Sequence, residues 1–177
     1  MALVRFGEHT VTSHFIDKKG NYIISREEGG KHSFSEGLAA ADTYFEDLGE
    51  FWELKAYKTG YINKKNEMVI SEIFDDAGDF SEGLAPVCIG NKWGYIDKNG
   101  KYQIALTYQD ARSFSDGLAA VKQNGKWGFI NKDNKFVIKP QYKNVDDCIN
   151  RLIMVKDSKD KFLHYIDKNN NKITPKI

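Results

Sequence analysis

A repeated phrase constrains this 177-residue chain more than any other feature. The hexapeptide FSEGLA at residues 80–85 returns as FSDGLA at 114–119, and the same FSEGLA also stands at 34–39. A second phrase follows, WGYIDKNG at 93–100 and WGFINKDN at 127–134, so that both phrases recur after 34 residues. A fixed period of roughly 20–50 residues is typical of repeat architectures, in which the shared residues serve packing. The sequence therefore predicts shape more directly than chemistry.

The isoleucine of the second phrase marks five copies of the repeated unit. It falls at Ile16, Ile62, Ile96, Ile130 and Ile166. The corresponding units span approximately 1–33, 34–79, 80–113, 114–147 and 148–177, which gives a single repeat domain over residues 1–177. Because this residue type is the same in otherwise divergent copies, we predict that all five isoleucines occupy equivalent buried positions.

One unit reads as three short strands. Residues 118–122 favour a first strand, and the following Asn124 and Gly125 form the strongest short hairpin signal. Residues 126–130 and 135–138 favour the second and third strands, joined by a polar turn. Each unit is therefore predicted to be a three-stranded antiparallel β-meander.

Other positions of the unit carry turn and connector signals. The spacing of Tyr108, Ala111 and Phe114 predicts one helical turn in the connector between units. The glycine of the repeated Ser-Glu/Asp-Gly-Leu phrase is predicted to adopt a left-handed conformation. The glycine that follows each tryptophan is typical of a close backbone approach.

The aspartates that open the second turn do not have the properties of catalytic carboxylates. They are Asp17, Asp97 and Asp167, and the other copies carry Asn63 and Asn131 instead. Asp and Asn can both accept hydrogen bonds from nearby backbone amides. A carboxylate that moves protons could not be replaced by an amide, so we interpret these side chains as turn caps.

Four stretches together resemble the WG-repeat (KWG-repeat) family of bacterial proteins. They are FSEGLA at 80–85, NKWGYIDKNG at 91–100, GKWGFIN at 125–131 and IKPQY at 138–142. The first, second and fifth copies lack the Trp-Gly pair and carry Ser-His, Thr-Gly and Leu-His instead. The resemblance implies a β-rich repeat scaffold and supplies no catalytic residues.

The predicted fold class is therefore an all-β repeat array of five units. A three-stranded unit cannot bury its apolar face alone, so neighbouring units are expected to stack and form a continuous core. The divergent outer copies favour an open, solenoid-like stack with capped ends. A closed five-bladed, propeller-like ring is the alternative.

The second unit carries an insertion. Gly37 and Gly60 are 23 residues apart, whereas Gly83 and Gly94 are 11 apart, which places 12 extra residues within 42–58. Its apolar residues recur at helical spacing, and Thr43 with Glu46 forms a capping-box pair; the apolar residues are Tyr44, Phe45, Leu48, Phe51 and Trp52. We predict a short helix, either folded over the sheet or protruding as an acidic, aromatic partner contact.

The function predicted from these features is a non-enzymatic scaffold that binds a protein or peptide. The candidate binding residues are Tyr44, Glu46, Asp47, Glu50, Phe51, Trp52, Trp93 and Trp127. Core packing is the alternative interpretation for both Trp93 and Trp127. A carbohydrate or cell-envelope binder that uses repeated aromatics is the second functional hypothesis, and an enzyme is the third.

Composition limits the remaining function classes. The formal net charge is +1, which suggests neither nucleic acid nor an anionic membrane as the partner. Cys88 and Cys148 occupy different repeat positions, and the four histidines lack metal-site spacing, so we expect no disulfide, metal or cofactor. No apolar run is long enough for a membrane span, and no signal peptide is visible. A cytoplasmic location is predicted, with secretion left open if a leader was removed.

Overall fold

The computed structural model describes the backbone of residues 2–6, 12–16, 19, 22–26, 33–47 and 54–173, and the side chains of residues 19, 33–42 and 58–173. Within these residues the chain forms five antiparallel sheets and no helix. Two sheets have three described strands: β1 (Ala2–Phe6), β2 (Thr12–Ile16) and β3 (Tyr22–Arg26), then β4 (Leu38–Asp47), β5 (Leu54–Asn63) and β6 (Met68–Phe74). Three sheets have four: β7 (Asp76–Ala77), β8 (Leu84–Ile89), β9 (Lys92–Asp97) and β10 (Tyr102–Tyr108); β11 (Asp110–Ala111), β12 (Ala119–Gln123), β13 (Lys126–Ile130) and β14 (Phe136–Tyr142); β15 (Asn144–Ile149), β16 (Leu152–Lys156), β17 (Phe162–Asp167) and β18 (Lys172–Ile173).

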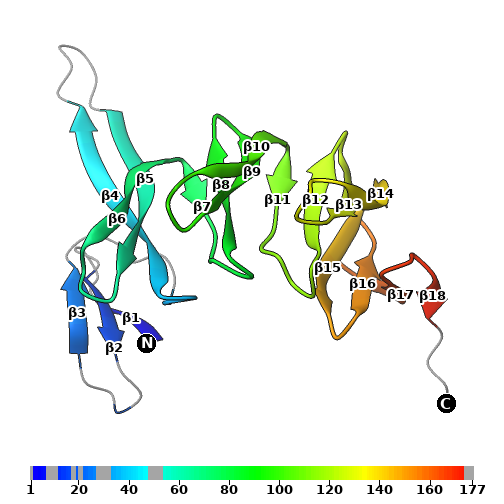
Figure 1. Ribbon diagram of the computed structural model, residues 1–177, viewed down its shortest axis with the longest axis horizontal. Coiled ribbons are helices and arrows are strands. Elements are labelled where there is room, and N and C mark those ends of the chain that lie inside the picture. The colour runs from blue at the N-terminus through cyan, green and yellow to red at the C-terminus, as the bar shows by residue number, and fades with distance from the viewer. Residues whose placement is uncertain are drawn as a thin grey trace.

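The sheets form an open array. Those of β4–β6, β7–β10, β11–β14 and β15–β18 follow one another along the long axis of the molecule (Figure 1). Strand order within each sheet follows the chain, so every connection is a hairpin or a short link to the next sheet. The predicted all-β array is confirmed, and the open stack is observed in place of the closed ring.

The unit differs from the prediction in its first strand. A two-residue strand just before the third unit joins its sheet: Asp76 and Ala77 pair with Cys88 and Val87 of β8. Its counterpart β11 pairs in the same way with β12, so these sheets have four strands and not three. The predicted helical turn in this connector is wrong, because extended backbone here can bond to the neighbouring strand edge.

The predicted helix in the insertion is also wrong for the part that the structure describes. β4 and β5 are ten residues each and pair continuously from Leu38 opposite Asn63 to Asp47 opposite Leu54. Tyr44 and Phe45, which belong to the residues at helical spacing, and Thr43 of the predicted capping box are also strong strand formers. Extending an existing hairpin gives each of them a cross-strand partner, whereas a helix would require a new nucleus. Residues 48–53 lie outside the described part of the chain.

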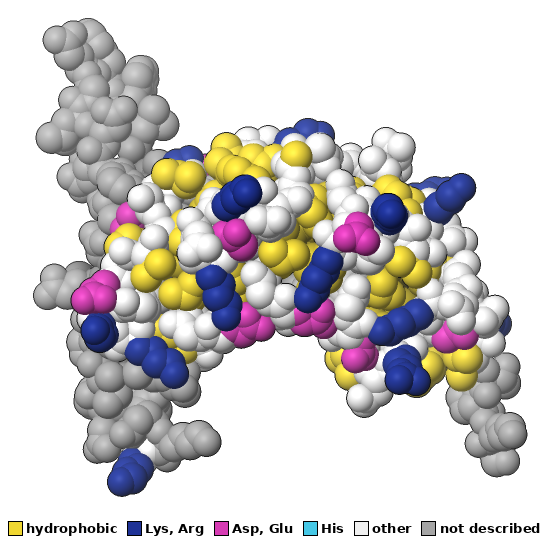
Figure 2. Space-filling model, in the orientation of Figure 1, with side chains coloured by type: hydrophobic (Ala, Val, Ile, Leu, Met, Phe, Trp, Pro, Cys, Tyr) yellow, Lys and Arg dark blue, Asp and Glu magenta, His cyan; other side chains and the backbone are white. Residues whose placement is uncertain are grey.

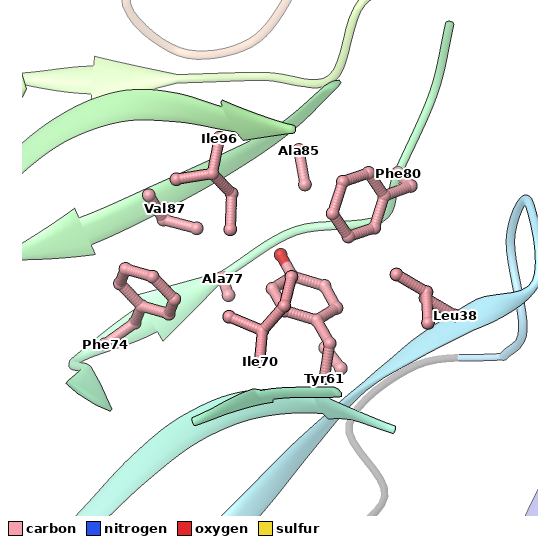
Figure 3. Close-up of a cluster of buried hydrophobic side chains, with 10 residues drawn as sticks. Leu38, Tyr61, Ile70, Phe74, Ala77, Phe80, Ala85, Val87 and Ile96 are labelled. Atoms are coloured by element: carbon pink, nitrogen blue, oxygen red, sulfur yellow. The ribbon is translucent and has the colours of Figure 1, made fainter. Parts of the chain in front are cut away.

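The apolar core lies between successive sheets. In Figure 3, Tyr61 and Ile70 of the second unit face Phe80, Val87 and Ile96 of the third. Two further clusters repeat this arrangement between the third and fourth units and between the fourth and fifth. Each unit therefore completes the core of its neighbour, as expected for a stacked repeat.

The marker isoleucines are buried wherever their side chains are described. Ile62, Ile96, Ile130 and Ile166 are at most 1% exposed. They lie in β5, β9, β13 and β17, and Ile96 pairs with Ala85 as Ile130 pairs with Ala119. The backbone of Ile16 in β2 occupies the equivalent position, because it pairs with Ala2 of β1. The side chain of Ile16 lies outside the described residues. The predicted equivalence is confirmed for these four.

In the second, third and fourth units, the aromatic residue before the marker isoleucine faces the following unit. Tyr61 packs edge-on against Phe80 at 4.8 Å between ring centroids, and Tyr95 packs against Phe114 at 5.0 Å. The Tyr61 hydroxyl donates to the carbonyl oxygen of Gly78 at 2.7 Å. In the third unit, Ile96 faces the preceding unit and Tyr95 faces the following unit, so one strand contacts both neighbours.

The repeated Ser-Glu/Asp-Gly-Leu phrase forms a two-residue hairpin turn. Glu82 and Gly83 have φ of 55° and 86°, and Ser81 bridges to Leu84. Positive φ at both central residues defines a type I′ turn, which fits the twist of the flanking strands. The predicted left-handed glycine is thus confirmed. In the fifth copy the same turn is made by Asn150 and Arg151, with φ of 51° and 64°.

Replacing Arg151 with glycine should stabilise the protein by about 1 kcal/mol, because a residue with a Cβ is sterically strained in the left-handed backbone conformation and glycine is not. The Arg151 amide donates to Asp116 through its backbone, so glycine keeps that bond. Urea denaturation of both proteins measures the gain. Gly117→Ala, at the equivalent position of the fourth unit where φ is 78°, should destabilise by a similar amount. An unchanged or lower stability of Arg151→Gly would contradict the expectation.

The charges of the repeat form a ladder along the array. The acid of one turn accepts a hydrogen bond from the backbone amide of the next turn: Glu36 from Gly83 at 3.1 Å, Glu82 from Gly117 at 2.9 Å and Asp116 from Arg151 at 2.9 Å. A lysine of the following unit joins each acidic residue: Lys98 pairs with Glu36 at 3.0 Å, Lys132 pairs with Glu82 at 3.3 Å, and Lys168 donates to the Asp116 carbonyl oxygen. The Lys98 ammonium lowers the pKa of Glu36. These repeated charges therefore serve the junctions between units.

The polar turns are capped as predicted. Asp97 Oδ1 accepts from the amides of Asn99 and Lys101 at 2.9 and 3.1 Å, and Asn63 Oδ1 accepts equivalent bonds in its own turn. Asp167 and Asn131 also accept from the backbone of their turns, whereas Asp17 lies outside the described residues. The interchange of Asp and Asn thus has a structural cause.

Asp157, in the turn between β16 and β17, provides a pH test of such a cap. Backbone amides of Lys161 and Lys159 lower its pKa below 3.8. A depressed folded-state pKa gives stability that is present above the unfolded value and is lost as pH falls through the folded value. Asp157→Asn keeps an acceptor without the titration, so its stability difference from the wild type should shrink below about pH 4. Urea midpoints measured across that range give the result, and a pH-independent difference would contradict it.

Candidate functional site

Trp127 shows what covers the repeated tryptophan at one junction. It lies in β13 and is only 5% exposed. The Arg112 guanidinium lies 5.0 Å from the centroid of its ring, and the Lys122 ammonium lies 5.9 Å away. A cation over an indole face is attracted by the ring quadrupole. The chain therefore supplies its own cations to this ring.

Two acidic residues of β15 hold Arg112 in place. Its Nη1 lies 3.7 Å from Asp146 and 3.9 Å from Asp147, both in β15. Burial raises the pKa of Asp147, Arg112 lowers it, and Asp146 raises it, with a net increase. The guanidinium is thus held between these two carboxylates and the Trp127 ring.

Trp93 is the same position one repeat earlier, and it is open to a hollow. It lies in β9 and is partly exposed. The residue equivalent to Arg112 is Gly78, and the residue equivalent to Lys122 is Cys88, each 34 positions earlier. A hollow of about 350 Å³ lies here, which we term the Trp93 groove; its lining includes Asp76, Gly78, Asp79, Pro86, Trp93 and Arg112.

Two acidic residues, Asp76 and Asp79, line the Trp93 groove. Burial raises the pKa of Tyr61, and the charges of Asp79 and Asp76 raise it further. Asp76 Oδ1 accepts the Ala77 amide at 2.8 Å, which fixes that carboxylate beside the strand. The Ser113 hydroxyl donates to the Asp79 carbonyl oxygen at 2.9 Å and ties the fourth unit to the same wall. The groove thus combines an indole, two carboxylates and a firm backbone.

Figure 2 shows acidic and basic side chains interspersed over the visible face, without a large patch of one sign. This agrees with the inter-unit ion pairs described above. That face therefore presents no broad charged surface for recognition. Local features such as the Trp93 groove are the candidate binding sites.

A second hollow of about 350 Å³ lies at the last junction, where its lining includes Tyr142, Lys156, Leu163 and His164. Leu163 and His164 replace the Trp-Gly pair in the fifth copy, and Leu163 is 52% exposed. This hollow has no tryptophan wall and is the weaker candidate.

The candidate binding residues from the sequence fall into separate places. Trp93 and Trp127 occupy equivalent positions, but only Trp93 borders an open groove. Tyr44, Glu46 and Asp47 lie in β4, in the sheet of the second unit. Three further candidates lie outside the described residues: Glu50, Phe51 and Trp52. The row of exposed aromatic residues that the carbohydrate hypothesis requires is therefore not formed by this pair.

The sequence reasoning did not single out the other walls of the Trp93 groove. Asp76, Gly78, Asp79 and Arg112 lie in or beside the short strands β7 and β11, where the sequence predicted only a helical turn. A residue-by-residue comparison of units 34 positions apart would have shown Gly78 opposite Arg112 and Cys88 opposite Lys122. Such exchanges of a cation for a small residue are the sequence signal that could have identified the groove.

No metal centre or membrane helix is found in the described part of the chain. There, no three His, Cys, Asp or Glu side chains are arranged to hold a metal ion. Among the same residues no helix has the length and apolarity needed to cross a membrane. The two cysteines are buried and free.

These features define a class of protein: an open array of β-sheets whose repeated aromatic, glycine and charged residues hold one unit to the next. A family model for the WG containing repeat matches three consecutive segments, residues 60–93, 93–127 and 127–156, which together cover more than half of the chain. The chain therefore belongs to the WG-repeat family, and the resemblance stated from the sequence is confirmed. No match was found among curated proteins.

Proposed function

We propose that this WG-repeat array is a non-enzymatic scaffold that binds a protein or peptide partner, with the Trp93 groove as the main contact. The observation that carries the proposal is the difference between two equivalent tryptophans. Trp127 is buried beneath Arg112, whereas Trp93 borders an open hollow. Partly exposed tryptophan is typical of the residues that anchor protein interfaces.

Firm walls support a binding role for the groove. Tyr95 donates to the Arg112 carbonyl oxygen at 2.8 Å, and Ser113 bonds to the third unit, so both sides are held by the core. A preorganised site loses little conformational entropy when a partner binds. The cytoplasmic location remains part of this proposal.

The alternative carbohydrate function gains no specific observation. It requires several aromatic faces open to solvent in succession, and the indole of Trp127 is covered. It is retained as one outcome of the experiment below.

Selection of random peptides displayed on phage against the purified chain tests the proposal. We expect enriched peptides that bind the wild type and lose at least about tenfold in affinity for Trp93→Ala, because a central tryptophan contributes about 2 kcal/mol or more to such an interface. Circular dichroism of the variant shows that the array remains folded. A parallel glycan array provides the competing arm. Failure to enrich any peptide, or enrichment of peptides indifferent to Trp93, would reject the proposed site, and glycan binding alone would favour the carbohydrate function.

The β4–β5 extension is proposed as a second contact. Glu46 and Asp47 stand near the end of β4, in a segment that the repeat does not need in order to continue. Reversing the charges of Glu46, Asp47 and Glu50 to lysine should weaken binding of a basic partner at low salt and leave folding intact. The selected peptides or the partner itself can be titrated against this variant. Unchanged affinity would confine recognition to the Trp93 groove.

A further inference from the structure

We infer that the ligand of the Trp93 groove is a lysine or arginine side chain of the partner, held as the chain's own Arg112 is held over Trp127. This inference rests on the proposed function, since it specifies the chemistry that the same groove recognises. It is carried by the comparison of two junctions within one molecule.

The junction at Trp127 shows an occupied site. Arg112 and Lys122 approach the ring to 5.0 and 5.9 Å, and the guanidinium is paired with two aspartates. The tryptophan in this setting is almost fully buried. When residues of the chain itself fill this repeat position, the side chain over the ring is therefore a cation.

The junction at Trp93 lacks both internal cations. Gly78 has no side chain to place over the ring, and Cys88 is a small neutral residue where Lys122 stands in the next unit. The resulting hollow of about 350 Å³ is near the lower end of ligand sites, roughly 300–1,000 Å³. Its size suits one long side chain better than a large ligand.

The charges around the Trp93 groove favour a cation. Asp76 lies in β7 and Asp79 two residues after it, and both line the groove; after burial, their charges raise the pKa of Tyr61. Arg112 also lines the groove, but its guanidinium is engaged at the next junction by Asp146, Asp147 and Trp127. An anionic ligand would face the two carboxylates and the electron-rich indole face, so the groove selects against it.

The repeat itself provides a variant that fills the groove. Gly78→Arg and Cys88→Lys introduce the two cations of the fourth unit. A Cβ at Gly78 would lie 2.8 Å from Pro86 Cγ, and the equivalent of Pro86 is Ala120, so Pro86→Ala accompanies them. The triple variant should fold, and its two added cationic side chains should occupy the Trp93 groove. A second variant, Asp76→Asn with Asp79→Asn, removes the charge and leaves the groove open.

The probes are short acetylated and amidated peptides of the form Gly-Gly-X-Gly-Gly, with X as arginine, lysine, citrulline, norleucine or glutamate. Titrations are followed by the indole N–H resonance of Trp93 in the full-length protein, assigned with Trp93→Phe. We expect the arginine and lysine peptides to shift the Trp93 resonance and to leave Trp127 unchanged. The citrulline, norleucine and glutamate peptides should bind at least about two- to fivefold more weakly, the range of an exposed cation–π contact. Added salt should weaken binding of the two cationic peptides.

The triple variant should lose binding of the arginine peptide, and the Asp76→Asn, Asp79→Asn variant should bind it at least about twofold more weakly. Equal binding of the citrulline and arginine peptides, full binding by the triple variant, or no shift at Trp93 would each overturn the inference. The phage selection distinguishes failure of the cationic-ligand inference from failure of the proposed binding function. Selected peptides that depend on Trp93 but lack Lys and Arg would reject only the cationic ligand. An absence of selected peptides would reject the binding function itself.

Discussion

Replacing Ile96 with alanine should destabilise the protein by about 2–5 kcal/mol, the cost of removing a large aliphatic side chain from a fully packed core. Ile96 is 0% exposed and lies in the cluster between the second and third units, where Figure 3 shows it beside Val87 and facing Ile70. The substitution leaves a cavity at a junction, so it weakens the contact between units as well as the unit itself.

Urea denaturation followed by circular dichroism measures this loss. Val69→Ala is the matched control, because Val69 is 46% exposed in the neighbouring β6 and should change stability by less than about 0.5 kcal/mol. Similar effects from both substitutions would mean that the junction does not depend on the marker isoleucine.

Replacing Gly94 with alanine should cost about 3 kcal/mol, because the added methyl group would overlap backbone that cannot move freely. A Cβ built at Gly94 lies 2.5 Å from the Ile104 carbonyl oxygen and 2.7 Å from the Ala105 carbonyl carbon. Gly60 and Gly128 have the same close approach in their units, at 2.5 and 2.6 Å. The position therefore requires glycine for steric reasons, since its φ is not left-handed.

Gly83→Ala separates this overlap from backbone strain. At Gly83 φ is 86° and no atom lies within 4 Å of an added Cβ, so alanine should cost only about 1 kcal/mol there. Urea unfolding of the two variants gives the comparison. A smaller loss for Gly94→Ala than for Gly83→Ala would show that β10 can shift away from β9.

Much of the unit could be predicted because its determinants are local. The Asn124–Gly125 hairpin, the left-handed glycine of the Ser-Glu-Gly-Leu turn and the capping by Asn63 or Asp97 each depend on a few adjacent residues. The burial of Ile96 and Ile130 followed from their recurrence through divergent copies. The close approach at Gly94 also followed from its fixed place after tryptophan.

The insertion was mispredicted because its apolar pattern suits two structures. Aromatic residues at helical spacing are equally compatible with the two sides of a long hairpin, and the pairing of β4 with β5 decides between them. That pairing is set by the Leu38–Asn63 end of the hairpin, which belongs to the repeat and not to the insertion.

The sequence by itself determined the period, the all-β repeat array, the turns and the buried positions, since these depend on local backbone preferences and on recurrence. Only the tertiary structure decided that Trp127 is covered and Trp93 is open. Arg112, whose guanidinium lies over Trp127, stands 15 positions earlier in the chain, directly after the short strand β11 that pairs with β12. Whether Gly78 or Arg112 stands there matters only once this packing is known, because a cation acts on an indole through contact and not through distance along the chain.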